Sequence, residues 1–279
     1  MCRPRHDYEA ITESLLPPNV LLTDGALHGI TDTVLRTARA QWSPVFAALP
    51  EPRVAVVVGG TVSRRWWQRP LAPDLTAAAA AELLRTTAAA AGQRGGSLLV
   101  TTSRRTSDAA SAAVAREVRA ANARGVPARA WAPSTTPPDS NPYIGLLAWA
   151  DYLVLTPDSI SMASEACATR NPVYVAWPHQ CHRRFARFHE RMLARGHVRA
   201  WPTTDGMLEP PMLWRPQWMA PASDGAAPLG APPAAPAAPH ETERNTHEDD
   251  LLRTARAVRL LLERNRVRSH VEGRVDLDT

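Results

Sequence analysis

The chain has 279 residues, which is enough for one large domain or two small ones. Its 32 basic residues are all arginines, and the formal charge of +5 favours anionic partners only weakly. The arginines form no stripe interleaved with aromatic residues, and no apolar run reaches the roughly 18 residues of a membrane span, so we expect neither nucleic-acid binding nor a transmembrane segment.

Residues 1–52 carry one predicted helix, from Thr31 to Leu49, in which apolar residues recur at helical spacing. Residues 53–201 alternate apolar runs with helical patterns. The predicted strands are 53–58, 97–100, 126–131, 152–155 and 172–176, and the helices are 76–91, 107–124, 143–150, 161–169 and 185–195. The strand runs are continuously apolar, which indicates burial on both faces. The sequence therefore predicts an α/β fold with a doubly wound, Rossmann-like parallel sheet.

The composition changes after this domain. Residues 202–248 include a stretch of Pro, Ala and Gly with few large apolar groups, and we expect a disordered linker there. Residues 249–279 begin with a predicted amphipathic helix, whose apolar face requires a partner surface and could bind a protein partner.

The cysteines are few and unevenly spaced: Cys2, Cys167 and Cys181 suit neither a disulfide framework nor a metal site. A reducing, cytoplasmic compartment is the simplest interpretation. His179, His182 and His189 lie near Cys181 in sequence, but their spacing matches no standard zinc pattern. We therefore predict no metal and no resident cofactor.

A glycine loop follows the first predicted strand. Gly59, Gly60 and Thr61 could let backbone N–H groups approach a phosphate. The loop lacks the complete dinucleotide fingerprint and the P-loop lysine, and it could equally be an ordinary strand-to-loop turn.

A second polar loop, residues 101–106, follows the second strand and precedes a helix. Ser103, Arg104 and Arg105 within it could bind an anion through charge-assisted hydrogen bonds. The alternative is a solvated loop with a helix cap.

The third polar segment lies between the fourth and fifth strands, where Ser159 and Ser161 begin a short helix and Glu165 lies one turn further. A helix start favours phosphate, and Glu165 could accept hydrogen bonds from sugar hydroxyls. Capping by Asp158 or Ser159 is the simpler alternative. Because parallel strands gather their following loops at one edge, the three segments together predict a nucleotide or nucleotide-sugar site.

These motifs resemble those of known families. Residues 56–61 with the Ser161–Glu165 segment are similar to the donor-binding domain of GT-B glycosyltransferases. That resemblance implies Gly59, Gly60, Thr61, Ser159 and Ser161 near phosphate and Glu165 near ribose.

A more specific resemblance, over about residues 4–201, is to the elongated-mitochondria (mitochondrial fission) protein family, whose fold is GT-B-like. The segments that carry it are 19–28, 49–53, 101–106, 141–143, 158–162 and 187–189. It implies that residues 1–52 are a remnant of the first GT-B domain with its connecting helix, and that 53–201 are the nucleotide-sugar-binding second half.

The resemblance implies glycosyltransferase-like chemistry if the chain is active. The acceptor site and catalytic base of GT-B enzymes usually come from the first domain, most of which we expect to be missing here. We therefore expect an N-terminally truncated protein that binds a nucleotide sugar, and we name no catalytic residue. The alternative function is a non-catalytic interaction scaffold of the fission-factor type.

Overall fold

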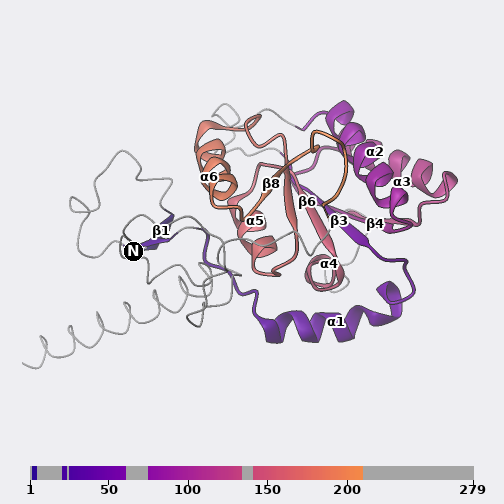
Figure 1. Cartoon of the computed structure of the whole chain (residues 1–279), viewed down its shortest axis with the longest axis horizontal. Coiled ribbons are helices and arrows are strands. Elements are labelled where there is room, and N and C mark those ends of the chain that lie inside the picture. Colours follow the sequence, from indigo (N-terminus) through magenta and orange to yellow (C-terminus); the bar gives the residue numbers. More distant parts are fainter. Residues whose placement is uncertain (1, 5–20, 24, 61–74, 134–140, 210–279) are drawn as a thin grey trace, which may run out of the picture. The chain divides into compact units, whose positions relative to one another are not determined.

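The computed structural model of the chain describes residues 2–4, 21–23, 25–60, 75–133 and 141–209 (Figure 1). The chain divides into two compact units, one of residues 1–28 with 223–279 and one of residues 29–222. In the first unit, β1 (Cys2–Pro4) and β2 (Leu21–Thr23) pair in parallel. The predicted helix of 249–279 and residues 210–248 of the predicted linker lie outside the described residues.

The second unit is built on a six-stranded sheet in the order β5-β4-β3-β6-β7-β8. Its strands are β3 (Arg53–Val58), β4 (Ser97–Thr102), β5 (Ala128–Trp131), β6 (Tyr152–Leu155), β7 (Val173–Ala176) and β8 (Arg199–Trp201). Every neighbouring pair in this sheet is parallel. The predicted α/β class with a parallel sheet is confirmed.

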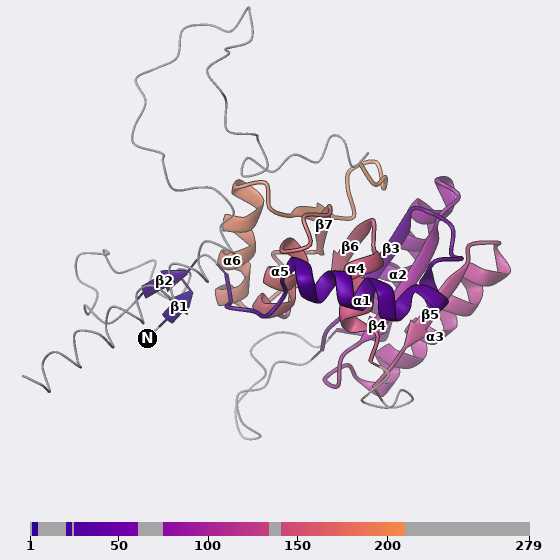
Figure 2. The same ribbon diagram turned by 90° about the horizontal axis from the view of Figure 1, so that it is seen from below.

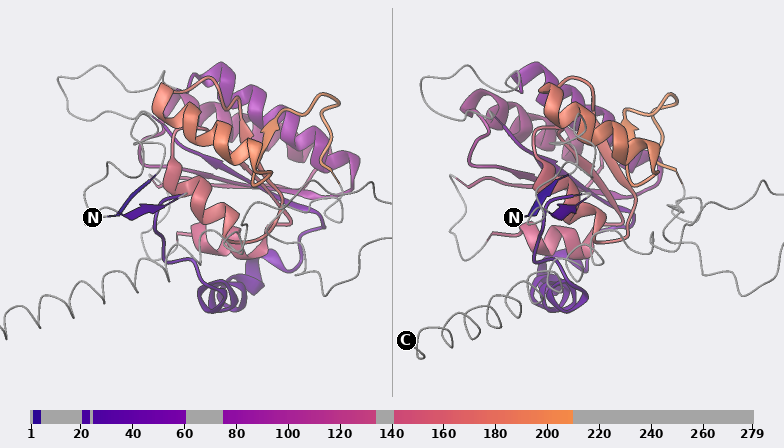
Figure 3. Two further views of the ribbon diagram at one scale, coloured as in Figure 1. Left: turned by 60° about the vertical axis from the view of Figure 1, so that its left-hand side comes forward. Right: turned by 90° about the vertical axis from the view of Figure 1, so that its left-hand side faces the viewer.

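Helices cover the sheet. They are α1 (Asp32–Phe46), α2 (Ala77–Gln93), α3 (Asp108–Ala123), α4 (Tyr143–Trp149), α5 (Ile160–Cys167) and α6 (Arg183–Ala194). With the sheet seen nearly edge-on, α2 lies on one side and α1 on the other (Figure 3). None of the helices in the described ranges is long and apolar enough to cross a bilayer.

The strand residues explain why the sheet is covered on both faces. All residues of β3, β4, β6 and β7 are buried, as their continuous apolar runs predict. The one charged residue in these four strands is Arg53, which is only 4% exposed. Its guanidinium donates to the Phe46 carbonyl at 3.2 Å and to Glu51 at 2.7 Å, so this buried charge is paired.

The structure differs from the prediction in one strand boundary, at β4, and in three short strands that were not predicted, β1, β2 and β8. Thr101 and Thr102 belong to β4, where they pair with Val57 and Val58, instead of to the following loop. β8 was not predicted because it has only three residues, and the surrounding sequence is polar at Arg199. Pairing with β7 determines this strand, and that pairing is not visible in the local pattern.

The helix α1 packs against α4 (Figure 2), and reciprocal hydrogen bonds hold the two helices together. The Trp149 indole donates to the Arg39 carbonyl at 2.8 Å, and the Arg39 guanidinium donates to the Ala148 carbonyl at 2.9 Å. Gly145 allows close approach, because a Cβ there would lie 2.4 Å from the Trp42 ring. The pair positions α4, which begins at the edge where the strands end.

Gly145→Ala should therefore destabilise the domain by about 1–3 kcal/mol, because an added methyl group in a tightly packed contact forces neighbouring atoms apart. Urea unfolding followed by circular dichroism would measure the change. Gly29→Ala is the matched control, since a Cβ at Gly29 meets nothing within 4 Å. Equal urea midpoints for the two variants would contradict this prediction, because they would show that the α1–α4 contact can relax without a loss in the free energy of unfolding.

Candidate functional site

A cavity of about 550 Å³ opens where the loops after the strands meet α4 and α5. Its lining comes from separate parts of the chain. The lining residues are Val57, Thr101, Thr102, Ser103, Arg104, Trp131, Ala132, Pro133, Asn141, Pro142, Tyr143, Ser159, Ser161, Met162 and Glu165. We call this cavity the Glu165 pocket.

The pocket lies at the point of the sheet where ligands bind in doubly wound folds. The chain builds β3, β4 and β5 outward in one direction, and then returns to place β6 on the other side of β3. The loops on either side of this reversal leave a crevice at the carboxyl ends of the strands. Residues after β4, β5 and β6 line the cavity, which agrees with that position.

The loop after β4 contributes the basic group. Ser103 continues the strand ladder, since its N–H donates to the Val58 carbonyl at 2.8 Å. The Ser103 hydroxyl accepts the N–H of Arg105 at 3.1 Å and so shapes the turn. Both arginines are exposed, but Arg104 lines the pocket, while Arg105 pairs with Asp158. The two predicted arginines therefore have different positions.

The start of α5 contributes the hydroxyls. Ser159 is the N-cap, and its Oγ accepts the N–H of Met162 at 3.3 Å. The capping alternative thus holds for Ser159, although the residue also lines the pocket. Ser161 and Glu165 are one turn apart on α5, and both face the pocket as their spacing predicts.

Tyr143 at the start of α4 is a pocket residue that we did not predict. Its hydroxyl donates to the carboxylate of Glu165. Burial, and then the neighbouring Glu165 carboxylate, raise the pKa of Tyr143 far above its usual value, so the phenol stays protonated and acts as a donor. The Asn141–Tyr143 segment carried part of the family resemblance, and that was the available signal.

Thr102 and Trp131 form the wall of the pocket at the sheet. Trp131 packs edge-on against the buried Phe46, with ring centroids 5.5 Å apart. Thr102 is 6% exposed, and its hydroxyl has no hydrogen-bond partner among the residues that the structure describes.

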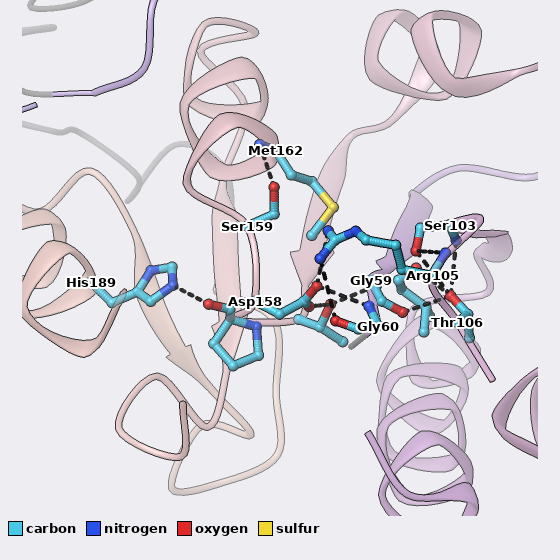
Figure 4. Close-up of polar contacts among 12 residues, drawn as sticks. Gly59, Gly60, Ser103, Arg105, Thr106, Asp158, Ser159, Met162 and His189 are labelled. Atoms are coloured by element: carbon cyan, nitrogen blue, oxygen red, sulfur yellow. Dashed lines mark hydrogen bonds and ion pairs between the residues drawn. The ribbon is translucent and has the colours of Figure 1, made fainter. Parts of the chain in front are cut away.

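The glycine loop contacts an acidic side chain (Figure 4). The Gly60 N–H donates to Asp158 Oδ2 at 2.9 Å, and the Gly59 N–H donates to Thr156 Oγ1 at 2.7 Å. Arg105 pairs with the same Asp158 oxygen at 3.3 Å. We call Gly60, Arg105, Thr156 and Asp158 the Asp158 cluster. It joins the loops after β3, β4 and β6.

The histidine-rich segment around α6 supports the loop after β6. His189 is fully buried, and its Nε2 lies 2.9 Å from the Pro157 carbonyl, so Nε2 carries the proton (Figure 4). Burial lowers the pKa of His189, and the Pro157 hydrogen bond and the Asp158 charge oppose this only partly. Cys181 contacts the Pro178 carbonyl, and burial raises the pKa of its thiol to about 11. A thiol with that pKa is a poor nucleophile at neutral pH.

The structure thus brings together the predicted residues Ser103, Arg104, Ser159, Ser161 and Glu165 in one cavity. Gly59, Gly60 and Arg105 are outside its lining and take part in the neighbouring polar contacts. Thr61 lies outside the described residues.

Comparisons with known proteins agree with the resemblance. The family model described as Mitochondrial fission ELM1 matches residues 1–224. The chain is 34% identical over 223 residues to the Mitochondrial fission protein ELM1 of Arabidopsis thaliana, covering 74% of this chain and 48% of that protein. It is 48% identical over 46 residues to uncharacterized protein RP120 of Rickettsia prowazekii (strain Madrid E), covering 16% of this chain and 13% of that protein. The chain therefore spans about half the length of the Arabidopsis relative.

His189 should make stability depend on pH. Below its usual pKa of about 6.5, the unfolded imidazole binds a proton that the buried one does not. The free energy of unfolding should therefore fall as pH falls from about 6.5 toward the lower folded pKa, by at most about 1.4 kcal/mol per pH unit. Urea unfolding of wild type and His189→Gln at pH 7.5 and 5.5 would measure the loss, which should be smaller in the variant.

Met192→Leu is the control for this measurement, because Met192 is another buried residue of α6 and the substitution adds or removes no titratable group. Its pH dependence should match that of the wild type. Identical pH dependence in wild type and His189→Gln would contradict a buried neutral imidazole.

Proposed function

The chain belongs to the mitochondrial fission ELM1 family, and on this premise we propose that it binds a nucleotide or nucleotide sugar in the Glu165 pocket. The observation that carries the proposal is the joint placement of Arg104, Ser161 and Glu165 around one cavity. Its volume of about 550 Å³ is within the roughly 300–1,000 Å³ of small-molecule sites.

The anionic end of the ligand would lie between Arg104 and the start of α5. The first N–H groups of a helix carry partial positive charge, and Ser159 satisfies the N–H of Met162 while leaving the first turn facing the cavity. Arg104 would add a charge-assisted hydrogen bond from the opposite loop. This arrangement suits a phosphate.

The ribose end of the ligand would lie at Glu165. Its carboxylate faces the cavity, and the hydrogen bond from Tyr143 fixes the position of one carboxylate oxygen. A carboxylate has enough acceptor sites to bind this donor and also a sugar hydroxyl. Tyr143 therefore enters the proposal as the residue that orients Glu165.

The base of the nucleotide would lie toward the apolar wall at Trp131 and Pro133. Aromatic side chains provide flat apolar surfaces on which a base can stack. Because every base can stack on such a surface, we propose a nucleotide without naming its base.

The predicted glycine residues enter the proposal in a supporting role. The N–H groups of Gly59 and Gly60 donate to Thr156 and Asp158, and these bonds hold the loop after β6 that leads to Ser159. We therefore propose that the phosphate lies next to the loop after β6, and that Gly59 and Gly60 hold this loop in position without contacting the phosphate.

We extend the proposal to a binding protein of GT-B-like ancestry that works in the cytoplasm. The cytoplasmic part depends on the cysteines, since Cys167 and Cys181 are free thiols within the described ranges. Residues 53–201 remain our proposed nucleotide-sugar-binding domain, and the described residues within that range include every residue of the pocket lining.

The second candidate is an interaction scaffold without catalysis. The Arabidopsis relative is a mitochondrial fission protein, and this favours the second candidate. Ligand titration separates the two candidates: a scaffold that retains only the fold would bind no nucleotide with saturation.

Glu165→Ala should weaken nucleotide binding by about 1–3 kcal/mol, because a hydrogen bond to a partly buried charge is lost. Calorimetric titration with UDP and other nucleoside diphosphates would measure this. Glu82→Ala is the control, since Glu82 lies on α2 and pairs with Arg85 away from the pocket lining. Absence of saturable binding to any nucleotide by the folded wild type would end the proposal.

Arg104→Met should weaken the binding of nucleotides and leave nucleosides unaffected. The expected loss is about 1.5–3 kcal/mol for a nucleotide, the usual size for a hydrogen bond to a charged group. Parallel titrations with uridine and UMP would reveal the difference. Arg129→Met, on an exposed position of β5, is the charge-matched control. Equal losses for nucleoside and nucleotide would place the phosphate elsewhere.

A further inference from the structure

We infer that Asp158 acts as an internal anion that excludes phosphate from the glycine loop, and so confines the ligand's phosphate to Arg104 and the start of α5. The position of the ligand rests on the proposed function. The exclusion of phosphate from the glycine loop rests only on the contacts of Asp158 within the protein. Asp158 would be a specificity-determining residue that touches no substrate.

The first argument is that Asp158 already uses the donors a phosphate would need. Its Oδ2 accepts the Gly60 N–H at 2.9 Å and lies 3.3 Å from an Arg105 nitrogen. Its Oδ1 accepts the hydroxyl of Thr156 at 2.6 Å. An amide, a guanidinium and a hydroxyl around one negative group form an anion site, and here the anion is part of the protein.

The second argument is that packing fixes the carboxylate in this place. The side chain of Asp158 is only 12% exposed. A Cβ added to Gly59 would lie 2.0 Å from Asp158 Oδ2, and one added to Gly60 would lie 2.0 Å from the Arg105 carbonyl oxygen. The glycines therefore serve a close approach between protein groups, and this accounts for their presence without a phosphate.

The third argument concerns the loop that carries Arg105. The Thr106 hydroxyl donates to the Gly59 carbonyl at 2.6 Å, and the Ser103 N–H donates to the Val58 carbonyl at 2.8 Å. These bonds hold the loop after β4 against the glycine loop, and they keep the Arg105 guanidinium directed at Asp158 (Figure 4).

Charge decides between exclusion and displacement. A phosphate that replaced Asp158 at Gly60 would leave the aspartate carboxylate nearby, and two close anions repel each other strongly at a partly buried site. Breaking the pair with Arg105 would add a further cost. The carboxylate therefore stays in place, and a phosphate in the pocket binds on the side of Arg104 instead.

The experiment removes the internal anion and asks whether phosphate takes its place. Asp158→Ser leaves the Gly60 N–H and the Arg105 guanidinium without their carboxylate, and Asp158→Asn neutralises the charge at nearly constant volume. Asp108→Asn, at an exposed position in the first turn of α3, is the charge-matched control. Circular dichroism and thermal unfolding establish that each variant folds, and calorimetry measures the affinity for inorganic phosphate.

Asp158→Ser should bind inorganic phosphate at least about tenfold more tightly than wild type and Asp108→Asn. Adding Arg105→Met to Asp158→Ser should abolish the gain, because the opened site then lacks its cation. Should Asp158→Ser fail to fold, Asp158→Asn should still show a gain of several-fold from the removed repulsion. Unchanged phosphate affinity in the folded variants would overturn the inference.

Titrations with UMP and UDP separate this inference from the proposed function. Wild type should bind the two with affinities within about threefold, and Asp158→Ser should favour UDP by about tenfold, because its second phosphate reaches the opened site. A wild type that already favours UDP about tenfold, and loses this preference in Asp158→Ser, would overturn the inference. A wild type that binds neither nucleotide, with a variant that gains phosphate affinity, would end the proposed function and support the internal anion.

Discussion

The site depends on one constraint, which is that all strands of a parallel sheet run in the same direction, so that every connection between them has to cross back over the sheet. The turns that follow β3, β4 and β6 then meet at one edge, although their residues are far apart in sequence. Buried apolar strands make this arrangement favourable, because both faces of the sheet are removed from water. The polar loops bury much less apolar surface than the strands, so their side chains are less constrained by packing and are available to contact a ligand.

At this edge the polar residues separate into two groups with different chemistry. Glu165, Tyr143, Ser161 and Arg104 surround a cavity. Asp158 instead satisfies donors of the neighbouring glycine loop, and His189 supports the same region through the Pro157 carbonyl. The internal contacts hold the three loops in place, and the residues at the cavity remain able to contact a ligand. Stability and the proposed binding therefore depend on different side chains of the same short segment.

The sequence predicted the helices and most strands closely, because burial on both faces and N-caps leave local patterns. Thr76 and Ser107 cap their helices where the pattern placed the helix starts. It did not predict β1, β2 or β8, which are three-residue strands whose pairing is tertiary. It did not predict the pocket role of Tyr143 either, because a tyrosine at the start of a short helix carries no local sign of the glutamate that it contacts. It also could not distinguish Arg104 from Arg105, which are adjacent and chemically identical.

By itself, the sequence determined the α/β class, the order of the helices and of strands β3 to β7, and the gathering of the polar loops, because these follow from hydrophobic periodicity and the direction of parallel strands. Only the tertiary structure decided which donors remain available to a ligand. The carboxylate of Asp158 reaches Gly60 across a sequence separation of 98 residues. Such a contact depends on how the loops pack against each other, and the composition of neither loop reveals it.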